Sequence, residues 1–138
     1  MDMLSKEHRN WNMSQIKSKD TQPELLLRSM LHRTGSRYKL HVKTLPGKPD
    51  LVFPRYRSAI FVNGCFWHRH NGCQFAYMPK SREAFWEDKF EKTIARDKRN
   101  EQELRNSGWA VITVWECELK RAPNKVIDQV TEYLQGYH

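Results

Sequence analysis

The stretch DLVFPRYRSAIFVNGCFWHRHNGC, residues 50–73, decides the fold because it combines two strand patterns with a loop of metal ligands. DLVF (50–53) is a short apolar run, and YRSAIFVNG (56–64) is nearly continuous in apolar character. A continuous apolar run is typical of a strand covered on both faces, so 56–64 is predicted to lie centrally in a sheet. The ligand-rich loop is then expected to follow a central strand.

The segment DTQPELLLRSMLHRTG, residues 20–35, carries the start and stop signals of a helix. Asp20 or Thr21 is suited to cap the first turn, and Gly35 is suited to end the helix. Glu24 complements the positive end of the helix dipole. The apolar stripe predicted for this helix consists of Leu26, Leu27, Met30 and Leu31.

The other patterns complete an α/β chain. RYKLHV (37–42) alternates like a strand, and LPGKP (45–49) is typical of a turn. WAVITVWE (109–116) is a second continuous apolar run, and 124–136 indicates a closing helix. Residues 81–108 predict a long helix or helix pair, ended by Gly108, with an inner face of Phe85, Trp86, Phe90, Ile94 and Leu104.

The element order α-β-β-β-α-β-α predicts a mixed central sheet flanked by helices on both faces. We expect a single domain over 20–138, preceded by a polar, basic arm over 1–19. The length of 138 residues fits one core.

The charge balance favours a polyanionic partner. The chain has 24 Lys and Arg against 16 Asp and Glu, a formal net charge of +8. Nucleic acid is the leading partner class, and an anionic membrane surface is second. No apolar run approaches the roughly 18 residues of a membrane span, and the N-terminus lacks the apolar core of a signal peptide. We therefore expect a cytoplasmic protein.

Three cysteines and two histidines indicate a zinc site. Disulfides are rare in cytosolic proteins, so Cys65, Cys73 and Cys117 are predicted to be free or metal-bound. Three thiols and one histidine make a closed tetrahedral site of structural type, and either His68 or His70 is suited to be the fourth ligand. The alternative is three unrelated buried cysteines.

Two carboxylates are candidates for chemistry. Asp50 precedes an apolar strand directly after a glycine-containing turn, and Glu24 on the first helix is placed to converge with it. Such oxygens suit Mg²⁺, and a nearby histidine is suited to move a proton. The alternatives are a turn-capping aspartate and a glutamate that serves only the helix dipole.

Four blocks together resemble the very-short-patch repair (Vsr) DNA mismatch endonucleases. They are LPGKPDLVF (45–53), AIFVNGCFWHRHNGC (59–73), FWEDKFEKTIARDKRN (85–100) and GWAVITVWECEL (108–119). The resemblance implies a core like that of the PD-(D/E)xK restriction endonucleases. It also implies Mg²⁺-dependent nicking of one strand beside the T of a T:G mismatch, the product of 5-methylcytosine deamination.

The resemblance also implies residue roles. Asp50 and the backbone carbonyl of Val62 would bind Mg²⁺, Glu24 would order water, and His68 would transfer a proton. The structural zinc ligands would be Cys65, His70, Cys73 and Cys117.

The resemblance further implies that the mismatch is recognised by wedge residues, which are side chains that insert between stacked bases. By the resemblance, Phe66 and Trp67 enter the base stack and Met13 enters from the other groove. A mispair costs less to unstack than a paired step, and stacking on aromatic rings returns part of that cost. Lys48, Arg69 and Trp86 are further candidates for DNA contact.

The chain departs from the family pattern at two places. Asn63 stands where the better-known pattern has a histidine that assists catalysis, and the loop is one residue longer through Asn71-Gly72. An amide hydrogen-bonds but does not shuttle a proton at neutral pH. Two alternatives therefore stay open: an endonuclease with another mismatch or site preference, and a non-catalytic zinc-stabilised DNA-binding module.

The resemblance also sets the expected context of action. We expect a bacterial, nucleoid-associated monomer acting on duplex DNA, because one asymmetric mismatch has no symmetry to match. Functional links to a cytosine-5 methyltransferase, a repair polymerase and a ligase are expected.

Overall fold

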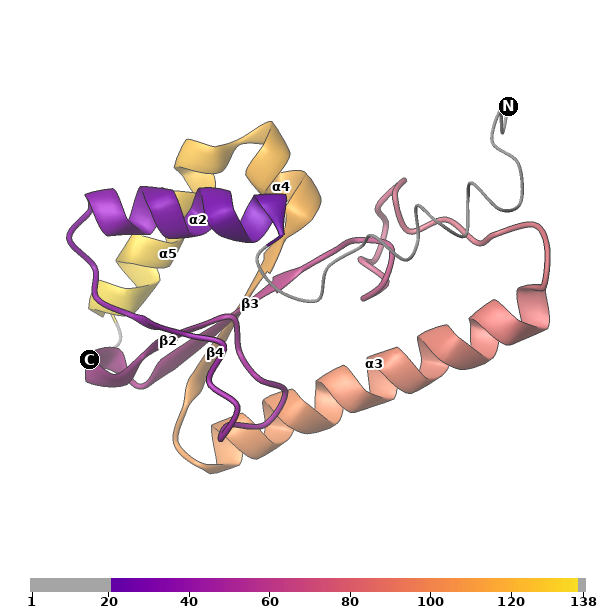
Figure 1. Ribbon diagram of the computed structural model, residues 1–138, viewed down its shortest axis with the longest axis horizontal. Helices are drawn as coiled ribbons and strands as arrows, with labels where there is room; N and C mark the ends of the chain where they lie inside the picture. Colours follow the sequence, from indigo (N-terminus) through magenta and orange to yellow (C-terminus); the bar gives the residue numbers. More distant parts are fainter. Residues whose placement is uncertain (1–20, 137–138) are drawn as a thin grey trace.

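The computed structural model describes residues 21–136, which build one four-stranded sheet with helices on both faces (Figure 1). The predicted arm over 1–19, with Met13, and the candidate cap Asp20 lie outside the described residues. The elements are α2 (Gln22–Arg33), β1 (Lys39–Leu40), β2 (Leu51–Phe53), a 3-10 turn (Pro54–Tyr56), β3 (Ser58–Asn63), α3 (Glu83–Asn106), β4 (Ala110–Trp115), α4 (Glu116–Arg121) and α5 (Pro123–Gly136).

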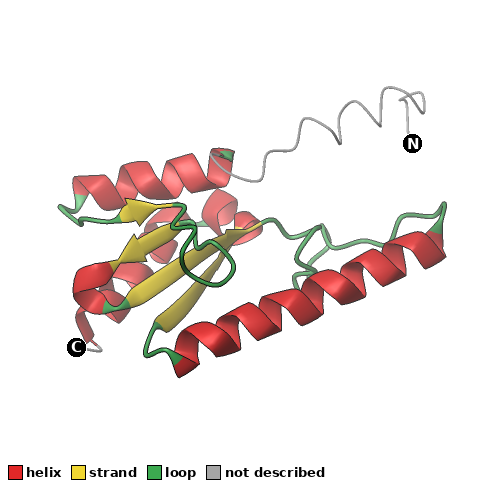
Figure 2. Ribbon diagram, turned by 60° about the horizontal axis from the view of Figure 1, so that its bottom comes forward, coloured by secondary structure: helices red, strands yellow, loops and turns green. Residues whose placement is uncertain are grey.

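The sheet is mixed, with the strand order β1-β2-β3-β4 (Figure 2). β2 runs antiparallel to both β1 and β3, whereas β3 and β4 are parallel and place Asn63 opposite Trp115. A parallel pair needs a crossover connection, which α3 supplies here. The central position predicted for β3 is confirmed.

Helices cover both faces of the sheet, as the element order predicts. α2, α4 and α5 lie on one face, and α3 runs along the other (Figures 1 and 2). On the first face Leu31, Leu51, Ile60 and Leu134 belong to one buried cluster. On the second face Ala59 and Val111 pack with Leu104 of α3.

Two predicted strands differ from the observed ones. The strand expected over 37–42 is only Lys39–Leu40, because His41 adopts a left-handed backbone conformation (φ 46°) that ends the pairing. β4 lies at an edge of the sheet, and its Thr113 is exposed, although its apolar run predicted a continuously buried strand.

The segment predicted as a long helix or a helix pair is a single helix, α3, and part of its predicted inner face is wrong. Phe90 and Leu104 are buried, but Phe85 and Ile94 are exposed. The N-terminal half of α3 extends past the sheet beside the 64–80 segment (Figure 1), so fewer core residues cover it there. Leu26 of α2 is likewise exposed at 38%, whereas Leu27 and Leu31 are buried.

The helix boundaries follow local chemistry. Thr21 caps α2, its Oγ1 accepting a hydrogen bond from the Glu24 amide at 3.3 Å. Gly35 (φ 84°) and Gly108 (φ 87°) follow α2 and α3 in the left-handed conformation that favours glycine. Among residues 21–136, no helix is both long enough and apolar enough to cross a bilayer.

Candidate functional site

Glu24, His41 and Asp50 meet at the amino end of β2, and we name them the carboxylate centre. One ligand atom from each lies within 4.8 Å of the other two. Glu24 is almost fully buried, and its Oε2 lies 2.7 Å from His41 Nε2 and 3.2 Å from an Arg28 guanidinium nitrogen. A buried carboxylate with two such partners does more than complement the helix dipole. The alternative that Glu24 serves only the dipole is therefore disfavoured.

Asp50 is fixed by the strand next to it. Its Oδ2 accepts a hydrogen bond from the Val62 amide of β3 at 2.7 Å. Burial raises the pKa of Asp50 to about 6, and the neighbouring Glu24 carboxylate adds to the rise, although the Val62 hydrogen bond opposes it. A carboxyl group with a raised pKa beside a second carboxylate is typical of a functional site.

The carboxylate centre fits a divalent cation. Two carboxylates suit Mg²⁺, which takes oxygen ligands and keeps several waters. The antiparallel pairing of β2 and β3 places Val62 beside Asp50, where the observed contact is made by the Val62 amide N–H. Binding of Mg²⁺ by Asp50 and the Val62 carbonyl stays a prediction. Sequence reasoning missed His41, because only the alternation of 37–42 marked it.

His68 is held by an aspartate from α3. Its Nδ1 lies 2.7 Å from Asp97 Oδ2, and both side chains are partly exposed. With Nδ1 so engaged, Nε2 is the ring nitrogen that remains for a substrate. No sequence pattern marks Asp97, because it stands among the alternating charges of a solvent-facing helix.

The four predicted zinc ligands converge, and we name Cys65, His70, Cys73 and Cys117 the thiol cluster. Their ligand atoms all lie within 4.8 Å of one another. His70 Nδ1 is 3.6 Å from Cys65 Sγ and 3.4 Å from Cys117 Sγ, and the His70 ring stacks on Trp115. His70, and not His68, therefore joins the thiols, and three sulfurs with one imidazole match the donors of a structural zinc site.

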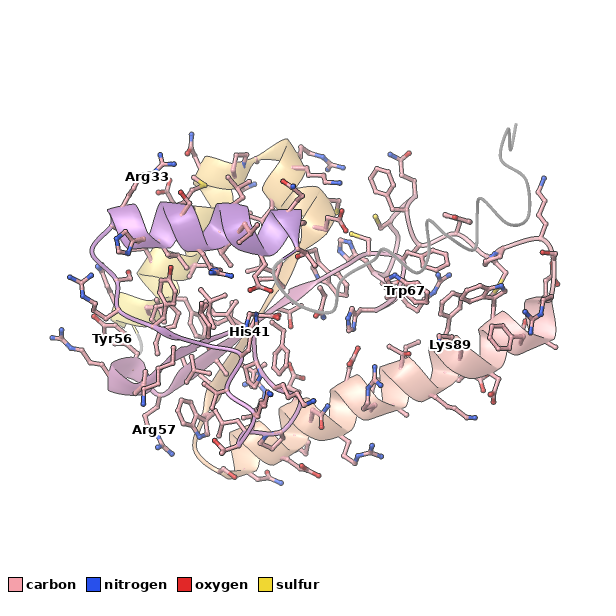
Figure 3. The ribbon with its side chains drawn as sticks, in the orientation of Figure 1. Arg33, His41, Tyr56, Arg57, Trp67 and Lys89 are labelled. Carbon is pink, nitrogen blue, oxygen red and sulfur yellow. The ribbon has the colours of Figure 1, made fainter. Side chains whose placement is uncertain are left out.

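Aromatic rings gather between the loop and α3, and we name Phe66, Trp67, Trp86 and Phe90 the aromatic cluster. Phe66 lies edge-on to Trp67, Trp86 and Phe90, with ring centroids 5.0, 5.8 and 5.3 Å away. Trp67 lies between the loop and α3, where Lys89 Nζ is 5.9 Å from its ring (Figure 3). The structure thus brings three of the predicted DNA-contacting residues together.

Of the remaining predicted residues, Lys48 and Asn63 lie apart from the aromatic cluster, whereas Arg69 lies against Phe66 and Phe90. Lys48 is exposed in the 44–49 turn, with a left-handed backbone (φ 50°). Asn63 ends β3, directly before the thiol cluster. The Arg69 guanidinium is occupied by partners inside the protein, and its predicted contact with DNA stays a prediction.

The chain is similar in sequence to known DNA endonucleases. Residues 1–74 match the family described as DNA mismatch endonuclease Vsr. The chain is 38% identical over 136 residues to the DNA mismatch endonuclease Vsr of Escherichia coli (strain K12), covering 99% of this chain and 86% of that protein.

Two nicking enzymes are also similar. The type II nicking enzyme V.XorIIP of Xanthomonas oryzae pv. oryzae is 52% identical over 118 residues, 86% of either chain. The type II nicking enzyme V.NmeAIP of Neisseria meningitidis serogroup A is 44% identical over 126 residues, 91% of this chain and 87% of the relative.

Proposed function

The chain belongs to the Vsr family of DNA mismatch endonucleases, and from this premise we propose that it nicks DNA beside the T of a T:G mismatch, with Mg²⁺. The observation that carries the proposal is the carboxylate centre, where two carboxylates and an imidazole meet in a partly buried site. A DNA-binding module without catalysis has no use for a buried carboxylate pair, whose mutual repulsion and desolvation are costly.

Asp50 and the Val62 carbonyl would hold Mg²⁺, and Glu24 would orient a water molecule. Bound Mg²⁺ supplies Lewis acidity at the scissile phosphate. Glu24 is kept in place by Arg28 and His41, so it reaches Asp50 without freedom to rotate. We further propose that this core is of the PD-(D/E)xK restriction-endonuclease type.

His68 would transfer the proton. Asp97 accepts from Nδ1, which fixes the tautomer and leaves Nε2 as the base toward the substrate. Asn63 has no titratable group, so its role would be to orient phosphate or water through its amide.

Zinc in the thiol cluster would be structural. Cys65 and Cys117 are buried, and the cluster joins the 64–73 loop to the first turn of α4. A closed set of four protein ligands leaves no open position for a substrate. The ion would therefore stiffen the loop that carries Phe66 and Trp67.

Recognition would rest on the aromatic cluster. Phe66, Trp67 and Trp86 would enter or flank the stack at the mispair, with Met13 inserted from the opposite groove. Lys48 would contact the DNA backbone. The two rings of Phe66 and Trp67 stand on consecutive residues beside His68, so the wedge and the proton-transfer residue would approach the duplex together.

The setting of the reaction follows from its product. A nick needs a polymerase and a ligase afterwards, and the mismatch arises where a cytosine-5 methyltransferase has acted. We propose a monomer acting on the bacterial nucleoid in the cytoplasm, with residues 1–19 as a DNA-contacting arm and 20–138 as the endonuclease domain.

A nicking assay tests the proposal. Two end-labelled duplexes that differ only in one T:G or T:A pair are incubated with protein and Mg²⁺ over a panel of flanking sequences. A cut only in the T strand of the mispaired duplex is expected, and Asp50→Ala is expected to lower the rate at least about 10³-fold while sparing DNA binding. Asp128→Ala, an exposed aspartate on α5, is the matched control.

Other outcomes would contradict the proposal in distinct ways. Equal cutting of both duplexes would mean a restriction-like preference. Binding without any cut, with Mn²⁺ as well, would mean a non-catalytic module. Full activity of Asp50→Ala would overturn the assignment of the carboxylate centre.

A further inference from the structure

Arg69 cross-links three segments around the aromatic cluster. Its Nη1 donates to the carbonyl oxygens of Phe66 and Tyr77, each at 3.1 Å, and its Nη2 donates to the Ala76 carbonyl at 2.8 Å. The guanidinium carbon also lies 3.8 Å from the ring centroid of Phe90 on α3. One side chain thus joins the 64–70 loop, the 74–78 segment and the long helix.

These contacts use the guanidinium in a way that disfavours a phosphate contact. A guanidinium has five N–H donors in one plane, and a carbonyl triad uses three of them. The guanidinium carbon also lies over the Phe90 ring, 3.8 Å from its centroid, so this ring limits access to the group. A group so engaged is poorly placed to make the bidentate contact typical of arginine and phosphate.

The region needs such a link because no sheet supports it. Residues 64–82 contain no helix or strand, and the N-terminal half of α3 projects past the sheet beside them (Figure 2). The thiol cluster fixes the loop on the side of α4. Arg69 supplies a second attachment of the loop, with its guanidinium carbon 5.6 Å from the centroid of the Phe66 ring.

We propose that Arg69 is a positioning residue that holds the Phe66–Trp67 wedge in its base-stacking orientation before DNA binds. The role at the mismatch rests on the proposed function, whereas the cross-link itself concerns the protein alone. A preformed wedge lowers the ordering cost of binding, and that saving applies only to DNA into which the wedge inserts. Arg69 would therefore determine the preference for T:G over T:A, and not the general affinity for DNA.

The decisive variant is Arg69→Lys, which keeps the charge but has no planar fork to bridge three carbonyls. Arg69→Gln removes the charge as well. Arg69 has a left-handed backbone conformation (φ 55°), which is equally unfavourable for arginine, lysine and glutamine. Neither variant therefore adds backbone strain. Arg82→Gln is the matched control, because Arg82 also stacks on a ring, that of Phe85, but makes no hydrogen bond to a carbonyl within residues 21–136.

The first measurement is the dissociation constant for T:G and T:A duplexes, without Mg²⁺, over a range of salt concentrations. We expect both Arg69 variants to lose about 10-fold in the T:G over T:A ratio, and Arg69→Lys to keep the wild-type salt slope. A phosphate contact would give another pattern: Arg69→Lys would resemble wild type, and Arg69→Gln would weaken both duplexes equally and lower the slope by about one. That pattern would overturn the proposal.

The second measurement is amide hydrogen exchange of the DNA-free protein. Faster exchange is expected in peptides covering 64–70 and 74–80 of Arg69→Lys, with exchange in β2 and β3 unchanged. If these peptides of Arg69→Lys exchange at the wild-type rate, Arg69 does not cross-link the segments. A lower melting temperature with an unchanged T:G over T:A ratio would reduce Arg69 to a stabilising residue and overturn the positioning role.

The two measurements separate this inference from the proposed function. If the wild-type protein shows no preference for T:G, the proposed function fails, and hydrogen exchange alone decides the cross-link. If wild type prefers T:G and Arg69→Lys keeps that preference, only the inference about Arg69 fails.

Discussion

The carboxylate centre and the aromatic cluster are supported in different ways. Glu24 and Asp50 are placed by α2 and β2, and Asp50 is tied to β3 by a backbone amide. Phe66 and Trp67 stand in a segment without regular secondary structure, supported by the thiol cluster, by Arg69 and by ring contacts. The proposed catalytic site therefore depends on the fold, whereas the proposed recognition surface depends on a few local cross-links.

The difference predicts which changes harm which region. Loss of a cross-link should damage mismatch recognition and leave the sheet intact. Loss of a side chain in the carboxylate centre should stop cleavage and leave DNA binding intact.

Cys117→Ser should give the largest effect, because it removes a ligand that connects the loop to α4. We expect loss of about one bound zinc per chain and roughly 3–5 kcal/mol of stability. Metal analysis and urea unfolding measure both, and Glu118→Gln on the exposed side of α4 is the control. A variant that unfolds like wild type, with zinc still bound, would show that the cluster is not a zinc site.

Asp97→Asn should come next. The neutral side-chain amide of the new asparagine cannot stabilise a positive charge on His68 as the Asp97 carboxylate can. The single-turnover nicking rate should therefore fall about 10²-fold, with little change in duplex affinity. Asp88→Asn is a matched control on the same helix, where Asp88 pairs with exposed Lys92. Unchanged nicking in Asp97→Asn would remove the His68–Asp97 pair from the reaction.

Trp67→Ala should have a smaller effect, confined to recognition. A lost base-stacking ring is expected to cost about 1–3 kcal/mol, which is roughly 5- to 150-fold in affinity for the T:G duplex. Affinity for the T:A duplex should change little, and Trp67→Phe should restore most of the difference. Equal loss on both duplexes would contradict insertion of this ring.

Asp50→Asn should give an effect of opposite sign, a gain in stability measured without added Mg²⁺. The folded pKa of about 6 exceeds the ordinary value of 3.8, so the ionised carboxyl group destabilises the fold above pH 6. At pH 7.5 the variant should be more stable than wild type by roughly 1–3 kcal/mol. This difference should shrink as pH falls through 6 and vanish below about 4, as followed by urea unfolding. A gain in stability that persists at pH 4 would have a cause other than ionisation of Asp50.

Much of the fold could be predicted from the sequence because its signals are local. The apolar run at 56–64 indicated the central strand, and the candidate caps Asp20 or Thr21 and the glycine at 35 indicated the limits of α2. The thiol cluster was predictable in part: the spacing of Cys65 and Cys73 around two histidines indicated a metal site, but only the family resemblance selected His70 over His68. The family resemblance, confirmed by the comparisons, added the residue roles.

The rest depends on tertiary contacts that no local pattern marks. Asp97 is one acidic residue in a highly charged helix, and only the fold places it against His68. His41 ends a short strand, and only the packing of α2 sets it beside Glu24. Arg69 is predicted from the sequence only as a candidate for DNA contact, and nothing in the sequence indicates the three carbonyl groups that its guanidinium binds.

The regular spacing along α3 links these regions. Phe90, Asp97 and Leu104 are separated by seven residues each, about two helical turns, so they lie along one side of the helix. Phe90 belongs to the aromatic cluster, Asp97 contacts His68, and Leu104 packs in the core between α3 and the sheet. An insertion or deletion of one residue between any two would rotate the later part by about 100° relative to the earlier part. Evolution can therefore change the sequence of α3 freely on its exposed side, but it cannot easily change its length.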